Sequence, residues 1–251
     1  MAEKTAQDVR ATGDLMNRTG LATSSDAGVM RETALHFRPK GSEQQFRMLR
    51  QEIRRGLAPV GTMPPPASLK GMVKDVVRRL GGQKTTVLLD KIGERLAFER
   101  TGTRLYETLL EKLDGDGGFE GGPTRAQLQK IRDEEAAHFF LLHDMMTQLD
   151  GDPTAMTPSA DLAGVASTGV VAVVSDARTN LAESLEAILI AELVDRDGWV
   201  RLIELLEEAG QDEMVRACRQ AEREEEEHLA SVRSWLSAYT SASFEGERPA
   251  Q

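Results

Sequence analysis

Cysteine is nearly absent from this chain, since Cys218 is the only one in 251 residues. A single cysteine excludes a disulfide framework or a cysteine-based zinc or iron–sulfur site within one chain, and it suits a reducing compartment. Aromatic residues are also scarce, at 4% of the sequence, while Leu, Ala, Glu and Arg are common. This composition favours an all-α protein.

The chain also lacks a surplus of positive charge, because its formal net charge is −10. Nucleic acid is therefore not expected as a partner, since phosphate binding needs a basic surface. No apolar run reaches the length of a membrane span, and "MAEKTAQDVRATGDLMNRTG" lacks the apolar core of a signal peptide. We expect a cytoplasmic, soluble protein with no membrane partner.

Residues 1–69 are predicted to form an N-terminal arm that is partly disordered, because residues 1–40 are polar and show no sustained period. Within it, "GSEQQFRMLRQEIRRGL" predicts one short helix with Ser42 as its N-cap. The stretch "APVGTMPPPASLKG" predicts a Pro-rich linker. An amphipathic helix over "SLKGMVKDVVRRLGG" follows, closed by its two glycines.

Residues 70–240 are predicted to form a helical bundle, and residues 241–251 a frayed tail. Four long helices are expected at about 85–113, from "GGPTRAQ" to 149, at 181–209 and at 212–239. The first two and the last two are joined by short loops, which implies antiparallel neighbours. The stretch "TAMTPSADLAGVASTGVVAVVSDARTN", which could hold a short helix, lets the second and third run parallel. The sequence therefore predicts a four-helix bundle with one long crossover.

Each long helix has a core-facing stripe that is apolar except near its middle. Buried carboxylates are costly unless they are paired or bind a metal. Residues three apart on a helix share a face, so Glu-x-x-His can aim an oxygen and a nitrogen at one ion. The interruptions, in chain order, are Glu99, Glu135 with His138, Glu192, and Glu225 with His228. The pattern indicates a metal site.

The two halves of the bundle also look duplicated. "FERTGTRLYETLLEKL" aligns with "AELVDRDGWVRLIELL", and "RDEEAAHFFLL" aligns with "REEEEHLASV". Two helical hairpins related by a pseudo-two-fold axis would place one ligand set on either side of that axis.

A Glu from each of two helices and a Glu-x-x-His from each of the other two resembles the ferritin-like di-iron and di-manganese proteins. The phrases "MNRTG", "PVGTMPPP", "ERLAFERTGTRLYE", "TPSADLAGVAS" and "AELVDRDGW" are similar to bacterial ferritin-like domain proteins. The resemblance implies two iron ions, with manganese or a mixed Fe/Mn pair as alternatives. It implies that one metal is bound by Glu99, Glu135 and His138, and the other by Glu192, Glu225 and His228. Glu135 and Glu225 would be the bridging carboxylates.

Asp195 lies one turn after Glu192, where the first half of the chain has Gly102. Rubrerythrin-like proteins carry an extra carboxylate at this place, linked to peroxide reduction, which makes Asp195 a further candidate ligand. The alternative is a helical kink in which Asp195 pairs with an Arg. Tyr106 and Asp195 are the candidate catalytic residues, although Tyr106 and Trp199 could instead be core aromatics with one polar group.

The remaining histidines, the cysteine and the neighbouring glutamates are expected to have no part in the metal site. His36 and His143 belong to no cluster, and Cys218 is predicted to be a small core residue. Solvated helix faces are predicted for Glu134, Glu224, Glu226 and Glu227.

Four functions stay open on the sequence. The first is a di-iron peroxidase or oxidase that uses peroxide or dioxygen and an external electron donor, because the chain lacks a four-cysteine rubredoxin module. The others are ferroxidase action with iron storage, manganese catalase activity, and a helical scaffold with a vestigial site. A homodimer is a further expectation.

Overall fold

The computed structural model describes residues 24–37, 41–57 and 84–246, in which every regular element is an α-helix. The predicted all-α class is confirmed for this part of the chain, which contains eight helices. The chain divides into two units, Met1–Ala58 and Pro59–Gln251. The segment "MNRTG", the Pro-rich linker and the helix predicted over "SLKGMVKDVVRRLGG" lie outside the described residues.

The first unit contains helices α2 (Ala27–His36) and α3 (Glu43–Gly56). Helix α3 confirms the prediction, since the Ser42 hydroxyl accepts from the Gln45 N–H and the Gln45 side chain accepts from the Ser42 N–H. Helix α2 differs from the irregular chain predicted there. Its sequence "AGVMRETALH" has no proline and only one glycine, in its first turn, so nothing within it interrupts a helix.

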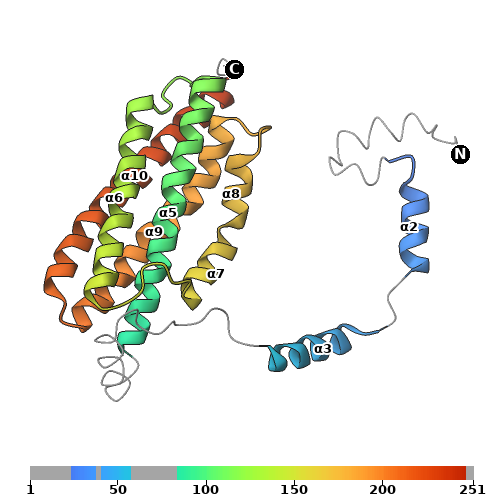
Figure 1. Ribbon diagram of the computed structural model, residues 1–251. Helices are drawn as coiled ribbons and strands as arrows, with labels where there is room; N and C mark the ends of the chain where they lie inside the picture. The colour runs from blue at the N-terminus through green and yellow to red at the C-terminus, as the bar shows by residue number, and fades with distance from the viewer. Residues whose placement is uncertain (1–23, 38–40, 58–83, 247–251) are drawn as a thin grey trace, which may run out of the picture. The chain divides into compact units, whose positions relative to one another are not determined.

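Four long helices make up most of the second unit: α5 (Lys84–Asp116), α6 (Arg125–Gln148), α9 (Leu181–Glu208) and α10 (Asp212–Phe244). Helix α5 packs against α6 and α9, and α10 packs against α9 and α6. Figure 1 shows that α5 and α6 run antiparallel, as do α9 and α10, whereas α6 and α9 run in the same direction. The result is a helical bundle in which the first and last long helices are also parallel.

The long connection between α6 and α9 contains two short helices, α7 (Pro158–Ala166) and α8 (Thr168–Ser175), where the sequence suggested one. Helix α7 packs on α5, and α8 packs on α9 (Figure 1). The valine-rich α8 is helical because Val170 and Val174 are buried in the bundle core. Within the described ranges no single helix is long and apolar enough to span a membrane; the pair α7 and α8, bent by 42°, passes by length and composition alone.

Capping residues and a glycine in the local sequence mark several ends of the long helices. Thr124 and Asn180 each form a capping box, at the starts of α6 and α9. Gly210, with φ +66°, turns the chain between α9 and α10. Helix α10 continues beyond the predicted end at 239, because no glycine or proline interrupts it before Gly246.

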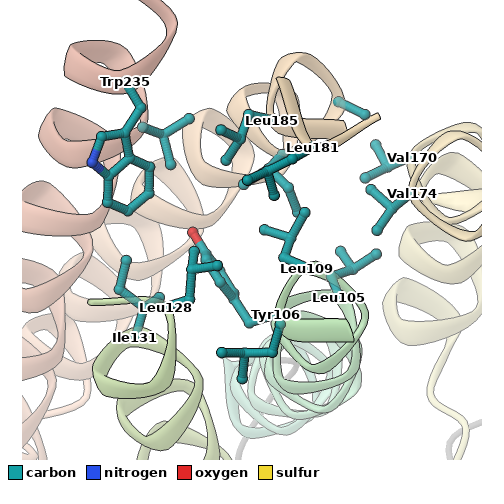
Figure 2. Close-up of a cluster of buried hydrophobic side chains, with 14 of the residues drawn as sticks. Leu105, Tyr106, Leu109, Leu128, Ile131, Val170, Val174, Leu181, Leu185 and Trp235 are labelled. Carbon is teal, nitrogen blue, oxygen red and sulfur yellow. The ribbon is translucent and has the colours of Figure 1, made fainter. Parts of the chain in front are cut away.

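The apolar core of the bundle consists of two clusters. The first contains Leu105, Tyr106 and Leu109 of α5 with residues of α6, α8, α9 and α10, whose side chains point toward one another in Figure 2. The second contains Leu88, Ile92 and Leu96 with residues of α6, α9 and α10. On each long helix the buried Glu and His residues lie between the two clusters, so apolar side chains flank them on both sides.

Candidate metal centre

All six ligands predicted from the sequence lie in the polar layer between the two apolar clusters. None is more than 3% exposed, although each carries a charge or a ring nitrogen. Because the helices repeat at 3.6 residues, an interruption of an apolar stripe faces the core. The packing of the four helices brings these polar side chains to the same level. The residues are Glu99 on α5, Glu135 and His138 on α6, Glu192 on α9, and Glu225 and His228 on α10.

Their donor atoms converge into overlapping groups, each with all atoms within 4.8 Å of one another. One group contains Glu99, His138 and Glu225, and a second contains Glu135, Glu192, Glu225 and His228. Glu225 belongs to both, and Glu135 recurs in a third group with Glu99, Asp195 and Glu225. Carboxylates shared between neighbouring groups are what a bridged pair of ions needs, and this buried Glu/His cluster could hold a metal ion.

The cluster also contains unpaired donor atoms, which tests whether it fits a metal. Buried polar groups normally have hydrogen-bond partners. Here one oxygen of each of the four glutamates has no hydrogen-bond partner in the described part of the chain. The same holds for Nδ1 of His138, which lies 2.8 Å from Oε1 of Glu225 without hydrogen-bond geometry. These atoms are available for coordination, so the residues fit a cationic metal.

Each histidine is oriented by a carboxylate from the opposite helix. Nε2 of His138 lies 2.8 Å from Oε2 of Glu224, and Nε2 of His228 lies 2.9 Å from Oε2 of Glu134. A proton on Nε2 leaves Nδ1 as the free nitrogen, and Nδ1 is the atom that faces the cluster in both residues. The prediction that Glu134 and Glu224 are only solvated was therefore wrong, because each is partly buried by its contact with a histidine.

Asp195 is buried and forms an ion pair with Arg95. The same guanidinium nitrogen, Nη2, also donates to Glu99, which makes Arg95 a link between a candidate ligand and Asp195. The pairing with an arginine, which belonged to the alternative interpretation of Asp195, is present. Asp195 also lies within reach of the cluster, since its carboxylate belongs to the group with Glu99, Glu135 and Glu225.

Two glycines make room for these side chains. A Cβ at Gly102 would collide with the Glu135 carboxylate, and a Cβ at Gly198 would lie 2.5 Å from Nη1 of Arg95. Gly102 aligns with Asp195 in the internal repeat, so the two halves differ at this point. The first half has a glycine where the second has a carboxylate.

Tyr106 and Trp199 are both buried core aromatics with one polar group, as predicted. The Tyr106 hydroxyl donates to Oε1 of Glu192 at 2.5 Å. Burial and the neighbouring Glu192 raise the pKa of Tyr106, which keeps its proton on the phenol. The Trp199 ring packs edge-on against His138, at 5.4 Å between ring centres.

The metal-free cluster holds extra protons. Burial and the Glu225 carboxylate raise the pKa of Glu192 to about 8, and burial with Glu225 and Glu99 raises the pKa of Glu135. Burial opposes the charged form of His138, but contacts with Glu225 and Glu99 outweigh it and raise its pKa to about 11. Protons thus balance the buried carboxylates in the absence of a cation.

The remaining histidines and the cysteine stand as the sequence predicted. His36 is exposed and His143 is partly exposed, and both lie outside the cluster, with Nδ1 of His143 3.2 Å from Asp144. Cys218 is a buried core residue, with its sulfur 3.8 Å from that of Met145.

Comparison of the chain with protein-family models, with curated proteins and with solved structures found no match. The chain is an all-helical protein with a buried carboxylate and histidine cluster. Its function has to be argued from that cluster.

Arg95, Glu134 and Glu224 are the residues that sequence reasoning missed. The repeat contained a signal for the two glutamates, because Glu134 and Glu224 occupy the same position before Glu135 and Glu225. For Arg95 the signal was its position four residues before Glu99, on the same helix face.

Proposed function

We propose that the four long helices α5, α6, α9 and α10 form a ferritin-like four-helix bundle that binds two metal ions, with iron as the metal. The observation that carries the proposal is Glu225, a fully buried carboxylate shared between two groups of donor atoms that each include a histidine. The parallel arrangement of α6 and α9, with a long crossover between them, supports the same fold (Figure 1).

In this proposal Glu99 and His138 bind one ion, Glu192 and His228 bind the other, and Glu135 and Glu225 bridge them. The donors are mainly carboxylate oxygens with one imidazole for each ion, which suits iron or manganese. The buried charges agree with two divalent ions. Five buried carboxylates, those of Glu99, Glu135, Glu192, Asp195 and Glu225, face one guanidinium, that of Arg95. Four negative charges are left for the metals to balance.

We propose further that the centre reduces peroxide or dioxygen, with electrons from a separate donor. A bound iron pair would supply the two electrons that, together with two protons from solvent, convert one hydrogen peroxide to two waters. The chain's own residues hold the ions, keep the two imidazoles in a single tautomer and exclude bulk water with the flanking apolar clusters. Tyr106 fixes Glu192 by its hydrogen bond.

The test is elemental analysis of protein purified without chelators or added metal, followed by anaerobic titration with Fe(II). We expect two irons per chain in the wild-type protein. Glu225→Gln should lose both ions, because the shared carboxylate contributes to both groups. Glu226→Gln is the matched control, since the neighbouring side chain is exposed on the same helix. Two metals retained in Glu225→Gln would refute the ligand assignment.

Activity assays then separate the chemistries. Peroxide consumption that requires a reductant supports the peroxidase. Iron retained far above two per chain would replace it with ferroxidase action and storage, and oxygen release from peroxide without reductant would indicate a manganese catalase. Failure to bind metal under any loading would leave a helical scaffold.

A further inference from the structure

A largely apolar pocket lies between α5, α9 and the crossover helices α7 and α8. Its volume is about 230 Å³, and Phe98, Leu105 and Val170 are among its buried walls. Apolar cavities of roughly 150 Å³ already accommodate benzene. The pocket is therefore large enough for a small organic molecule, and its walls are too apolar to order water well.

The pocket reaches the candidate metal centre at a glycine. Gly102 lines the pocket, and its Cα hydrogen is directed at the Glu135 carboxylate, where a Cβ would collide. No side chain therefore stands at this position of α5 between the pocket and a candidate bridging ligand. Gly198 lines the opposite side in the same way, against the guanidinium of Arg95.

Two arginines line the pocket. Arg95 lines it from the buried side, and its Nε has no hydrogen-bond partner within the described ranges. Arg201 lines it from the exposed side, and the hydrogen bond it forms is from Nε to the carbonyl of Asp197. The acidic residue of the lining, Glu94, pairs with Lys91 at 2.5 Å. An anionic group at the rim would meet Arg201, which forms no ion pair with a carboxylate of the residues that the structure describes.

From these features we infer that the pocket binds a small organic anion with an apolar body, of the class of medium-chain carboxylates. The carboxylate pairs with Arg201 at the rim, and the chain lies along Phe98 and Leu105 toward Gly102. An inorganic anion fits less well, because it has no apolar body to cover the apolar walls of the pocket. Binding itself needs no metal. That the molecule is a substrate, placed next to the ions by Gly102, rests on the proposed function.

The experiment is calorimetric titration of the full chain with octanoate, in metal-free and metal-loaded forms. Ala163→Leu narrows the pocket from α7, and Val165→Leu is its control, since Val165 lies on the same helix, is exposed and is outside the lining. We expect Ala163→Leu to weaken octanoate binding at least tenfold and Val165→Leu to change it less than twofold. Arg201→Gln should weaken it at least fivefold, and butanoate should bind at least tenfold more weakly than octanoate.

Octanoate binding that is absent, unchanged by Ala163→Leu, or equal to butanoate binding would overturn the inference. So would light scattering that shows a dimer which Ala163→Leu converts to monomer, because a second copy would then fill the site. The inference and the proposed function fail separately. Octanoate binding to a protein that takes up no metal supports the pocket alone, and two metals without octanoate binding support the metal centre alone.

Discussion

At the scale of single residues, the candidate centre depends on contacts that cross between helices. His138 of α6 is held by Glu224 of α10, and His228 of α10 is held by Glu134 of α6. This reciprocal arrangement follows the internal repeat. The glutamate before each Glu-x-x-His therefore has a positioning role, because its carboxylate contacts the histidine nitrogen that points away from the cluster.

Replacing Glu224 therefore tests the positioning role. Glu224→Ala should weaken metal binding by about 10–100-fold, because His138 loses the acceptor that fixes its tautomer. Glu224→Gln keeps an acceptor oxygen and should restore most of the affinity. Competition with a chelating dye measures the metal affinity of both variants. Glu226→Ala is the control for the loss of one negative charge. Equal losses in the Ala and Gln variants would contradict an orienting hydrogen bond.

Arg95 and Asp195 make a second residue-scale prediction. Arg95→Met leaves the carboxylates of Asp195 and Glu99 buried without their shared partner, and breaking a buried ion pair costs about 3–5 kcal/mol. Urea unfolding of the metal-free protein should show a loss of this order. Asp195→Asn in the Arg95→Met background should recover part of it, because the unpaired charge is gone. Additive costs in the double-mutant cycle would show that the two residues are not coupled.

At the scale of the element, helix α5 contains glycines in two different environments, one near its middle and one near its end. Gly102 lies at the level of the cluster, where the Glu135 carboxylate occupies the space of a side chain. Gly115 lies near the end of the helix with nothing within 4 Å of a Cβ. Glycine lowers helix stability at both positions, so only a packing requirement explains it at Gly102.

A matched pair of substitutions separates the two glycines. Gly102→Ala should displace Glu135 and lower metal affinity at least tenfold, whereas Gly115→Ala should leave metal binding unchanged and stabilise the protein by about 0.4–1 kcal/mol. Metal titration and urea unfolding of both variants provide the measurement. Normal metal binding by Gly102→Ala would mean that Glu135 moves without consequence and is not a ligand.

At the scale of the whole molecule, the protonated cluster links stability to pH. The native metal-free protein keeps protons that the unfolded chain releases, because the pKa of Glu192 is raised to about 8 and that of His228 to about 10. Burial and the Glu225 carboxylate raise the pKa of Glu192. Burial alone would lower the pKa of His228, but its contacts with Glu225 outweigh that effect and raise it.

The native state thus binds more protons than the unfolded state between about pH 6 and 9, so the free energy of unfolding should fall as the pH rises. The expected slope is on the order of 1 kcal/mol per pH unit for each retained proton. Urea midpoints at several pH values, with chelator present, test this. Metal-loaded protein should show a weaker or opposite slope, because metal binding has already displaced the protons. A urea midpoint that rises with pH in the presence of chelator would show that the native state does not retain these protons.

The sequence by itself determined the four long helices and the buried Glu and His residues that interrupt their apolar stripes. The periodicity of the stripes is local information, and the repeated Glu-x-x-His lies within one turn of helix. The same reasoning missed helix α2, the second crossover helix and the extended end of α10. Helix propensity is weak in these segments, and they are helical because of packing or because no helix-breaking residue interrupts them.

Only the tertiary structure decided which carboxylates meet. The contacts of Glu134 and Glu224 with histidines, the guanidinium of Arg95 between Glu99 and Asp195, and the pocket beside Gly102 all join residues from different helices. Helical periodicity tells which side of a helix faces the core. The rotation and height of one helix against another depend on the packing of whole side chains, which a pattern along one chain does not contain.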